Sequence, residues 1–72
     1  RMNFKPGDRY NFEDGNYIEV KQIKNAEYQN EVTQMVTYYI GGPRSLPRKL
    51  VMEVNQFISN FGHLFEDNTD KK

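Results

Sequence analysis

The chain contains no cysteine, no tryptophan and a single histidine, His63. Without cysteine it can form neither a disulfide nor a thiolate-ligated zinc site, and one histidine cannot supply a histidine-rich metal site. No apolar run is long enough to span a membrane, and no N-terminal apolar stretch resembles a signal peptide. These absences predict a small, soluble, cytoplasmic protein that carries neither a metal nor a cofactor.

An excess charge of one sign is missing as well, because ten Lys and Arg residues balance ten Asp and Glu residues. Dedicated DNA-binding domains are usually strongly basic, so this balance disfavours that class. What the chain does have is five Tyr and five Phe among its 72 residues. Each large ring buries about 150–250 Å², so a few rings can form most of a small core.

Alternation of apolar and polar residues predicts an N-terminal hairpin with strands at 9–13 and 17–24. The Asp-Gly pair between the two strands is a strong hairpin signal. A three-residue loop would put Gly15 at the left-handed position of the turn. It would also pair Tyr10 with Ile18, so that the apolar side chains of both strands share one face.

A third strand is predicted over 32–40, where β-branched and aromatic residues alternate between two faces. The polar stretch 25–31 that precedes it predicts a loop. In the second strand, Ile23 breaks the alternation of apolar residues, which predicts a β-bulge near Lys21 and Gln22.

The segment 45–65 fits two patterns. Apolar residues spaced by three or four predict one helix that begins near residue 46. Alternation over 50–54 instead predicts a fourth strand, followed by a shorter helix capped by Asn55. Both patterns predict a helix over 55–64, and the single long helix is slightly preferred.

These elements predict an α+β domain over residues 2–65, in which a three- or four-stranded antiparallel sheet packs on one C-terminal helix. Residues 66–72 are predicted to form a flexible tail. The core is predicted from the apolar face of the sheet and the apolar stripe of the helix: Tyr10, Phe12, Ile18, Val20, Val36, Tyr38, Ile40, Leu50, Val54, Phe57, Ile58 and Phe61.

No constellation of residues predicts catalysis. Nucleophilic catalysis needs a nucleophile, a base and an orienting group that converge, whereas His63 is better explained by the favourable position of a histidine near a helix C-terminus. The adjacent carboxylates at 13–14 and 66–67 belong to a turn and to the tail. Gly41 and Gly42 are not followed by the Lys-Ser/Thr pair of a phosphate-binding loop. We therefore expect a protein that is not an enzyme.

The solvent-facing side of the sheet is the first candidate binding surface. If the branched residues of the strands face the helix, the opposite side carries Tyr17, Met35 and Tyr39, with Arg and Lys residues between them. Aromatic residues and methionine are enriched at the centres of protein interfaces. These three residues are therefore the candidate protein-binding site.

Local clusters of basic residues form the second candidate. Three of the ten cations fall within residues 44–49, and others lie on the predicted strands. Such charges can contact phosphates without reading a base sequence. The candidate nucleic-acid-binding residues are Arg9, Lys21, Lys24, Arg44, Arg48 and Lys49.

Three features of the layout carry a resemblance: Lys5-Pro6-Gly7-Asp8, the hairpin loop Glu13-Asp14-Gly15-Asn16, and the apolar segment that ends Asn55-Gln56-Phe57-Ile58-Ser59-Asn60-Phe61. In these the chain resembles small single-domain proteins that are common in bacteriophage and prophage genomes. The resemblance implies a protein encoded by a phage or mobile element that binds a host or phage protein. The order of strands and helix is also similar to the arm-binding domains of some integrases and to plant AP2 domains, but this chain lacks their strongly basic sheet.

The sequence as a whole predicts a binding module that engages a protein partner, or a second copy of itself, through the outer side of its sheet or through an edge strand. The alternative is nucleic-acid binding through the basic residues. A third alternative is a small enzyme subunit whose active site another chain completes.

Overall fold

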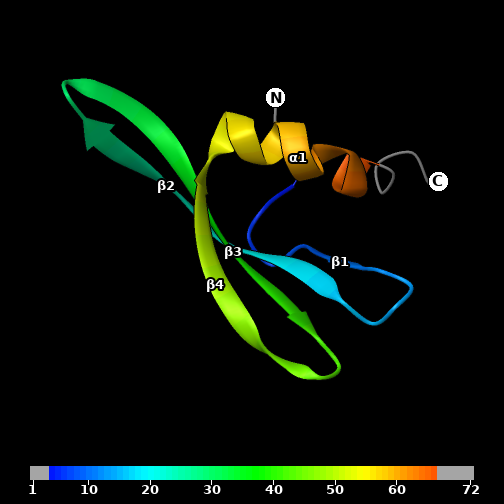
Figure 1. The fold of residues 1–72 in the computed structure, drawn as a ribbon. Coiled ribbons are helices and arrows are strands. Elements are labelled where there is room, and N and C mark those ends of the chain that lie inside the picture. The colour runs from blue at the N-terminus through cyan, green and yellow to red at the C-terminus, as the bar shows by residue number, and fades with distance from the viewer. Residues whose placement is uncertain (1–3, 67–72) are drawn as a thin grey trace.

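The computed structural model describes residues 4–66 as a four-stranded antiparallel sheet with one helix packed on it (Figure 1). The strands lie in the sheet in the order in which they occur along the chain. The α+β fold class predicted from the sequence is confirmed, whereas residues 67–72 of the predicted tail lie outside the described residues. The elements are β1 (Arg9–Asn11), β2 (Tyr17–Tyr28), β3 (Glu31–Gly42), β4 (Ser45–Glu53) and α1 (Val54–Glu66).

The β1–β2 hairpin has the predicted register. Tyr10 pairs with Ile18, and the amide of Phe12 donates to the carbonyl of Asn16 across a three-residue loop. Gly15 has φ 97°, the left-handed conformation that the loop requires and that glycine adopts without a steric penalty. The strand β1 itself is short and ends at Asn11 rather than at residue 13.

A turn at residues 5–8 anchors the start of the described chain to β2. The Asp8 side chain accepts a hydrogen bond from the Lys5 amide, and the amide of Gly7 donates to the carbonyl of Val20. The strand register shifts between Val20 and Gln22, which confirms the predicted bulge. This turn directs Phe4 into the core, where it is buried.

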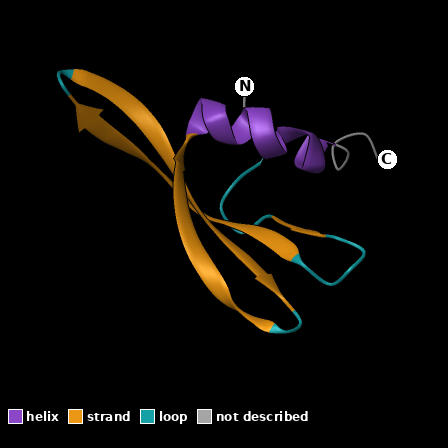
Figure 2. Cartoon of the chain, in the orientation of Figure 1, coloured by secondary structure: helices purple, strands orange, loops and turns teal. Residues whose placement is uncertain are grey.

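The prediction of a loop over 25–31 is wrong, because both strands continue through it. A two-residue turn at Gln29 and Asn30 closes the hairpin, and both residues have positive φ, 51° and 68°. We call residues 24–34 the β2–β3 arm; Figure 2 shows it extending past the helix. No helix packs against the end of the arm, and most of its residues are polar. The apolar alternation that marks a half-buried strand is therefore absent.

The preference for one helix from residue 46 is also wrong, since the alternative fourth strand is present. In β4, Leu50 and Met52 pair with Tyr38 and Val36 and share their face of the sheet. Apolar residues at 46, 50 and 54 satisfy both a helical and an alternating pattern, so spacing alone could not separate the two. Pro47, which would lie in the first turn of a helix, is also tolerated in an edge strand.

The helix begins at Val54, directly after β4. Its cap is the Glu53 carboxylate, whose Oε1 accepts a hydrogen bond from the Gln56 amide at 3.2 Å. The predicted capping role of Asn55 is therefore wrong, because Asn55 already lies within the helix.

The core lies between α1 and the sheet and is built around aromatic rings. Phe57 is fully buried, and its ring centroid lies 5.0 Å from those of both Phe4 and Tyr38. Phe65 closes the cluster at 5.9 Å from Phe4. Among the described residues, eight apolar side chains are buried, namely Phe4, Ile18, Val20, Val36, Tyr38, Val54, Phe57 and Phe65. Of the other predicted core residues, Tyr10, Ile40, Leu50, Ile58 and Phe61 are partly buried against this cluster.

The predicted core differs from the observed one at three phenylalanines, namely Phe4, Phe12 and Phe65. Phe12, expected inside, is 36% exposed, because β1 ends before it and its ring packs edge-on against Tyr10. Phe4 and Phe65 are buried but were not in the predicted core. Phe4 precedes the first strand, and Phe65, although it falls on the apolar stripe of the helix, lies one residue past the predicted helix 55–64.

Candidate binding surface

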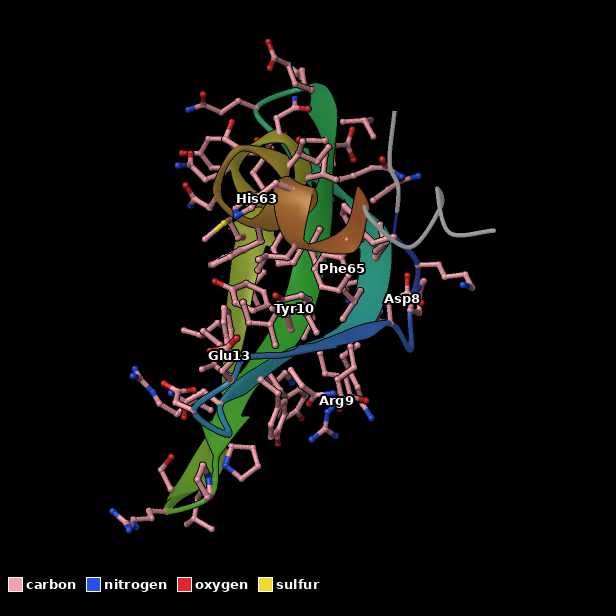
Figure 3. The ribbon with its side chains drawn as sticks, turned by 90° about the vertical axis from the view of Figure 1, so that its right-hand side faces the viewer. Asp8, Arg9, Tyr10, Glu13, His63 and Phe65 are labelled. Carbon is pink, nitrogen blue, oxygen red and sulfur yellow. The ribbon has the colours of Figure 1, made fainter. Side chains whose placement is uncertain are left out.

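The face of the sheet opposite α1, which we call the outer face, is covered by neither a helix nor a second sheet among residues 4–66. Figure 3 shows the alternation in β1, where Tyr10 points toward the helix and Arg9 points away from it. Strand register and side-chain contacts place the following residues on the outer face: Arg9, Tyr17, Glu19, Lys21, Lys24, Thr33, Met35, Thr37, Tyr39, Lys49, Val51 and Glu53.

The centre of the outer face is a line of three β3 side chains. Met35, Thr37 and Tyr39 follow one another at alternate positions, and Met35 and Tyr39 are partly buried. Thr37 is only 7% exposed although no element covers it, so its neighbours shield it. Val51 pairs with Thr37 from β4 and is 55% exposed. The predicted residues Met35 and Tyr39 therefore lie in one patch with Val51.

Val51 was missed because the preferred single helix over this segment left no fourth strand that could present it on the outer face. Had the strand alternative been chosen, alternation with Leu50 and Met52 would have placed Val51 on the outer face. The signal was present in the sequence, but it depended on choosing the correct period.

Tyr17 is fixed in place by its neighbours. Its ring lies over Gly41, since a Cβ on Gly41 would fall 2.6 Å from the Tyr17 Cζ. The guanidinium carbon of Arg9 lies 3.8 Å from the centroid of the same ring, within the range of a cation–π contact. Both contacts use ring surface that a stacking ligand would need. Tyr17 therefore serves to join three strands, and little of its ring is left for a partner.

Charged residues surround the central patch. Arg9 lies 3.6 Å from Glu19 in a half-exposed ion pair, and the Lys21 amine lies 5.8 Å from the centroid of the Tyr39 ring. On the other side, Lys49 pairs across the strands with Tyr39, and Glu53 pairs with Met35. The rim thus carries charges of both signs, whereas Met35, Thr37, Tyr39 and Val51 at the centre carry none.

The structure brings four of the six candidate phosphate-binding residues to the outer face. Arg9, Lys21, Lys24 and Lys49 lie there together. The other two lie elsewhere. Arg44 is in the β3–β4 turn at the end of the hairpin, and Arg48 pairs with Ile40 on the helix side of the sheet. The predicted basic loop 44–49 is therefore divided between the two faces of the sheet and the turn.

A second feature, a groove, has no counterpart in the sequence analysis. It has a volume of about 640 Å³ and lies on the helix side of the sheet, between the β1–β2 loop and the start of β4. It depends on the spacing between two hairpins, which no local pattern reveals. Its lining residues are Phe12, Asp14, Asn16, Ile18, Ile40, Gly41, Ser45, Leu46, Arg48 and Phe61.

Two titratable side chains, Tyr38 and His63, lie away from the outer face. Burial raises the pKa of the Tyr38 hydroxyl above its usual 10.0, but this side chain belongs to the core. His63 is exposed on α1 (Figure 3). Within residues 4–66, no group of three or more His, Cys, Asp or Glu side chains could hold a metal ion.

Comparisons with known proteins give no further guidance. No model of a protein family matches the chain, and neither the curated proteins nor the solved structures contain a match. In the described part of the chain, α1 is neither long enough nor apolar enough to cross a membrane. Function must therefore be argued from the outer face itself.

Proposed function

We propose that the chain is a binding module without catalytic activity that engages a protein partner through its outer face. The observation that carries the proposal is the uncharged patch of Met35, Thr37, Tyr39 and Val51 within a rim of mixed charge. Protein interfaces have this composition, with aromatic residues and methionine at the centre and charged residues at the rim. The layout resemblance to small phage proteins, which commonly bind a host or phage protein, agrees with this assignment.

Nucleic-acid binding is the second candidate, and the gathering of Arg9, Lys21, Lys24 and Lys49 on the outer face favours it. Three observations weigh against it. The ring of Tyr17 is already occupied, the acidic Glu19 and Glu53 lie among the cations, and the chain carries no net charge. Phosphate contacts need a positive field, which these carboxylates weaken.

The test compares partner capture by two double variants of the immobilised chain. Met35→Ala with Tyr39→Ala removes the centre of the outer face, and we expect capture of a specific protein to be lost. Tyr28→Ala with Val32→Ala is the matched control. These two residues are 71% and 68% exposed on the β2–β3 arm, and we expect this variant to retain capture.

Circular dichroism must first show that both double variants are folded. Capture that is unchanged in the Met35/Tyr39 variant would contradict the proposal. A complex that nuclease treatment abolishes, or that is lost steeply as salt is raised, would instead favour the second candidate, because phosphate contacts release counterions. If no DNA or RNA binds at low salt, the second candidate is removed.

A further inference from the structure

The strand β4 is the long open edge of the sheet. It is the last strand in the sheet order, so no described strand pairs with its outer side. The opposite edge is β1, which has only three residues. An unpaired edge presents backbone N–H and C=O groups that can bind another strand, and proteins usually protect such edges with proline, bulges or charge.

The proline and the bulge that interrupt β4 lie among its first residues. The register shifts between Ile40 and Gly42, so that Leu46 and Pro47 together lie opposite Gly41. From Arg48 onward the strand is regular and pairs residue by residue with β3. The stretch without proline or bulge is Lys49-Leu50-Val51-Met52-Glu53, and its two charges lie at its ends and are of opposite sign.

A second copy of the chain can pair with this stretch in an antiparallel sense across a two-fold axis perpendicular to the sheet. Residues that face each other share a side of the sheet, and a shift by one residue exchanges the two sides. Both sheets then keep their helices on the same side only if one residue of β4 lies at the axis and faces the same residue of the second copy. We call this residue the centre of the register, and only a few residues of β4 can take this position.

Charge selects one of these centres. With the axis at Val51, Lys49 of each copy faces Glu53 of the other, which gives two symmetric pairs of opposite charge. With the axis at Lys49, two lysines face each other. An axis at Leu50 or at Met52 leaves the Lys49 and Glu53 side chains opposite uncharged residues.

The register centred on Val51 also pairs the apolar side chains of β4. Val51, 55% exposed in the single chain, would face Val51 of the second copy on the outer face. Leu50 would face Met52 of the second copy on the helix side, where both residues pack against the core. We propose that two copies of this chain associate by antiparallel β4–β4 pairing centred on Val51, with Lys49 of each copy facing Glu53 of the other.

This dimer goes beyond the proposed function and does not depend on it. The joined sheets would present two central patches side by side, with Met35 and Tyr39 still uncovered. Loss of the dimer and loss of partner capture are separate results, because the charge reversals that test the dimer alter Lys49 and Glu53, whereas the capture test alters Met35 and Tyr39.

The first test uses the absence of cysteine from the sequence, because a single introduced cysteine reports on one position. Directly opposite residues in antiparallel strands have Cβ atoms about 4.5–5.5 Å apart, close to the distance that a disulfide spans. Under mild oxidation we expect Val51→Cys to form a covalent dimer. Val32→Cys, the same substitution at a 68% exposed position on the β2–β3 arm, is the matched control and should remain largely monomeric. Equal crosslinking of the two variants would overturn the proposal.

The second test reverses the charges one at a time, with sedimentation as the measurement. Lys49→Glu places like charges opposite each other at two sites, and we expect it to weaken self-association about tenfold. Glu53→Lys should do the same, and circular dichroism must confirm its helix because Glu53 caps α1. Mixing the two variants restores opposite charges and should yield a heterodimer. A dimer unaffected by Lys49→Glu, or a wild-type chain that is monomeric at every concentration, would overturn the proposal.

Discussion

Phe57 is the residue on which the core depends most. Its ring contacts those of Phe4, Tyr38, Phe61 and Phe65, at centroid distances between 5.0 and 6.3 Å, and it has no exposed surface. Tilted and edge-on aromatic pairs add stabilisation beyond the area that they bury. A single side chain therefore joins the N-terminal segment at Phe4, the sheet at Tyr38 and the later part of the helix at Phe61 and Phe65.

Removal of the Phe57 ring should take away a large part of the free energy of unfolding. Phe57→Ala is expected to cost about 3–5 kcal/mol, which is a large part of the roughly 5–10 kcal/mol that stabilises a domain of this size. Phe12→Ala, which removes the same side chain from a 36% exposed position, should cost less than about 1.5 kcal/mol. Urea denaturation measures both, and equal losses would contradict the assignment of Phe57 to the centre of the core.

At the scale of the element, the turns explain which strands could be predicted from the sequence. The β1–β2 loop was predictable because Asp14-Gly15 is a direct turn signal and the apolar residues on either side fix the register. The turn at Gln29 and Asn30 has the same kind of left-handed backbone without glycine, so it gave no comparable signal. The arm around it was therefore mistaken for a loop, although its chain is regular.

The same argument applies to the candidate site. Tyr39 and Met35 could be placed on the outer face because 32–40 alternates without interruption. Alternation puts Lys49 and Val51 on one face once this segment is taken as a strand. Their position beside Tyr39 and Thr37 depends on the register between β3 and β4, which no pattern within β4 specifies. Phe4 was missed for a related reason, since only the hydrogen bonds of the turn at residues 5–8 direct it inward.

The two left-handed glycines offer a matched test of how the β1–β2 loop meets the β3–β4 turn. Gly7 and Gly15 have φ values of 100° and 97°, so alanine is strained at both and should cost about 1–2 kcal/mol. A Cβ at residue 15 would also lie 2.9 Å from Pro43 Cγ, whereas a Cβ at residue 7 would have no neighbour within 4 Å. We expect Gly15→Ala to lower the melting temperature more than Gly7→Ala. The reverse order would show that the loop and the turn do not touch in solution.

At the scale of the whole molecule, the chain is less compact than its length predicts. Its radius of gyration is 13.1 Å, whereas a compact domain of this length would have about 11 Å. The difference comes from hairpins that extend past the helix, above all the β2–β3 arm (Figure 1). The stabilising core is therefore confined to the part of the sheet beneath α1.

The arm should accordingly be dispensable for folding. Replacing residues 27–32 with Asn-Gly keeps the pair Ala26–Thr33 and supplies a dipeptide that favours a tight hairpin turn. We expect the urea midpoint to change little, and small-angle scattering in dilute solution should give a radius of gyration nearer 11 Å. An unfolded variant would show that the arm contributes to the core.

The contact between Phe4 and Phe65 has a consequence for how the chain folds during its synthesis. The two rings come from opposite ends of the described segment, yet both are buried against Phe57. A nascent chain that is still attached to the ribosome and lacks residue 65 can form the hairpins of the sheet. The apolar side of these hairpins, which faces α1 in the folded protein, then remains exposed to solvent. The core can therefore form only after the helix has left the exit tunnel of the ribosome. Before that point, we expect the nascent chain to be most susceptible to proteolysis and to aggregation with other chains.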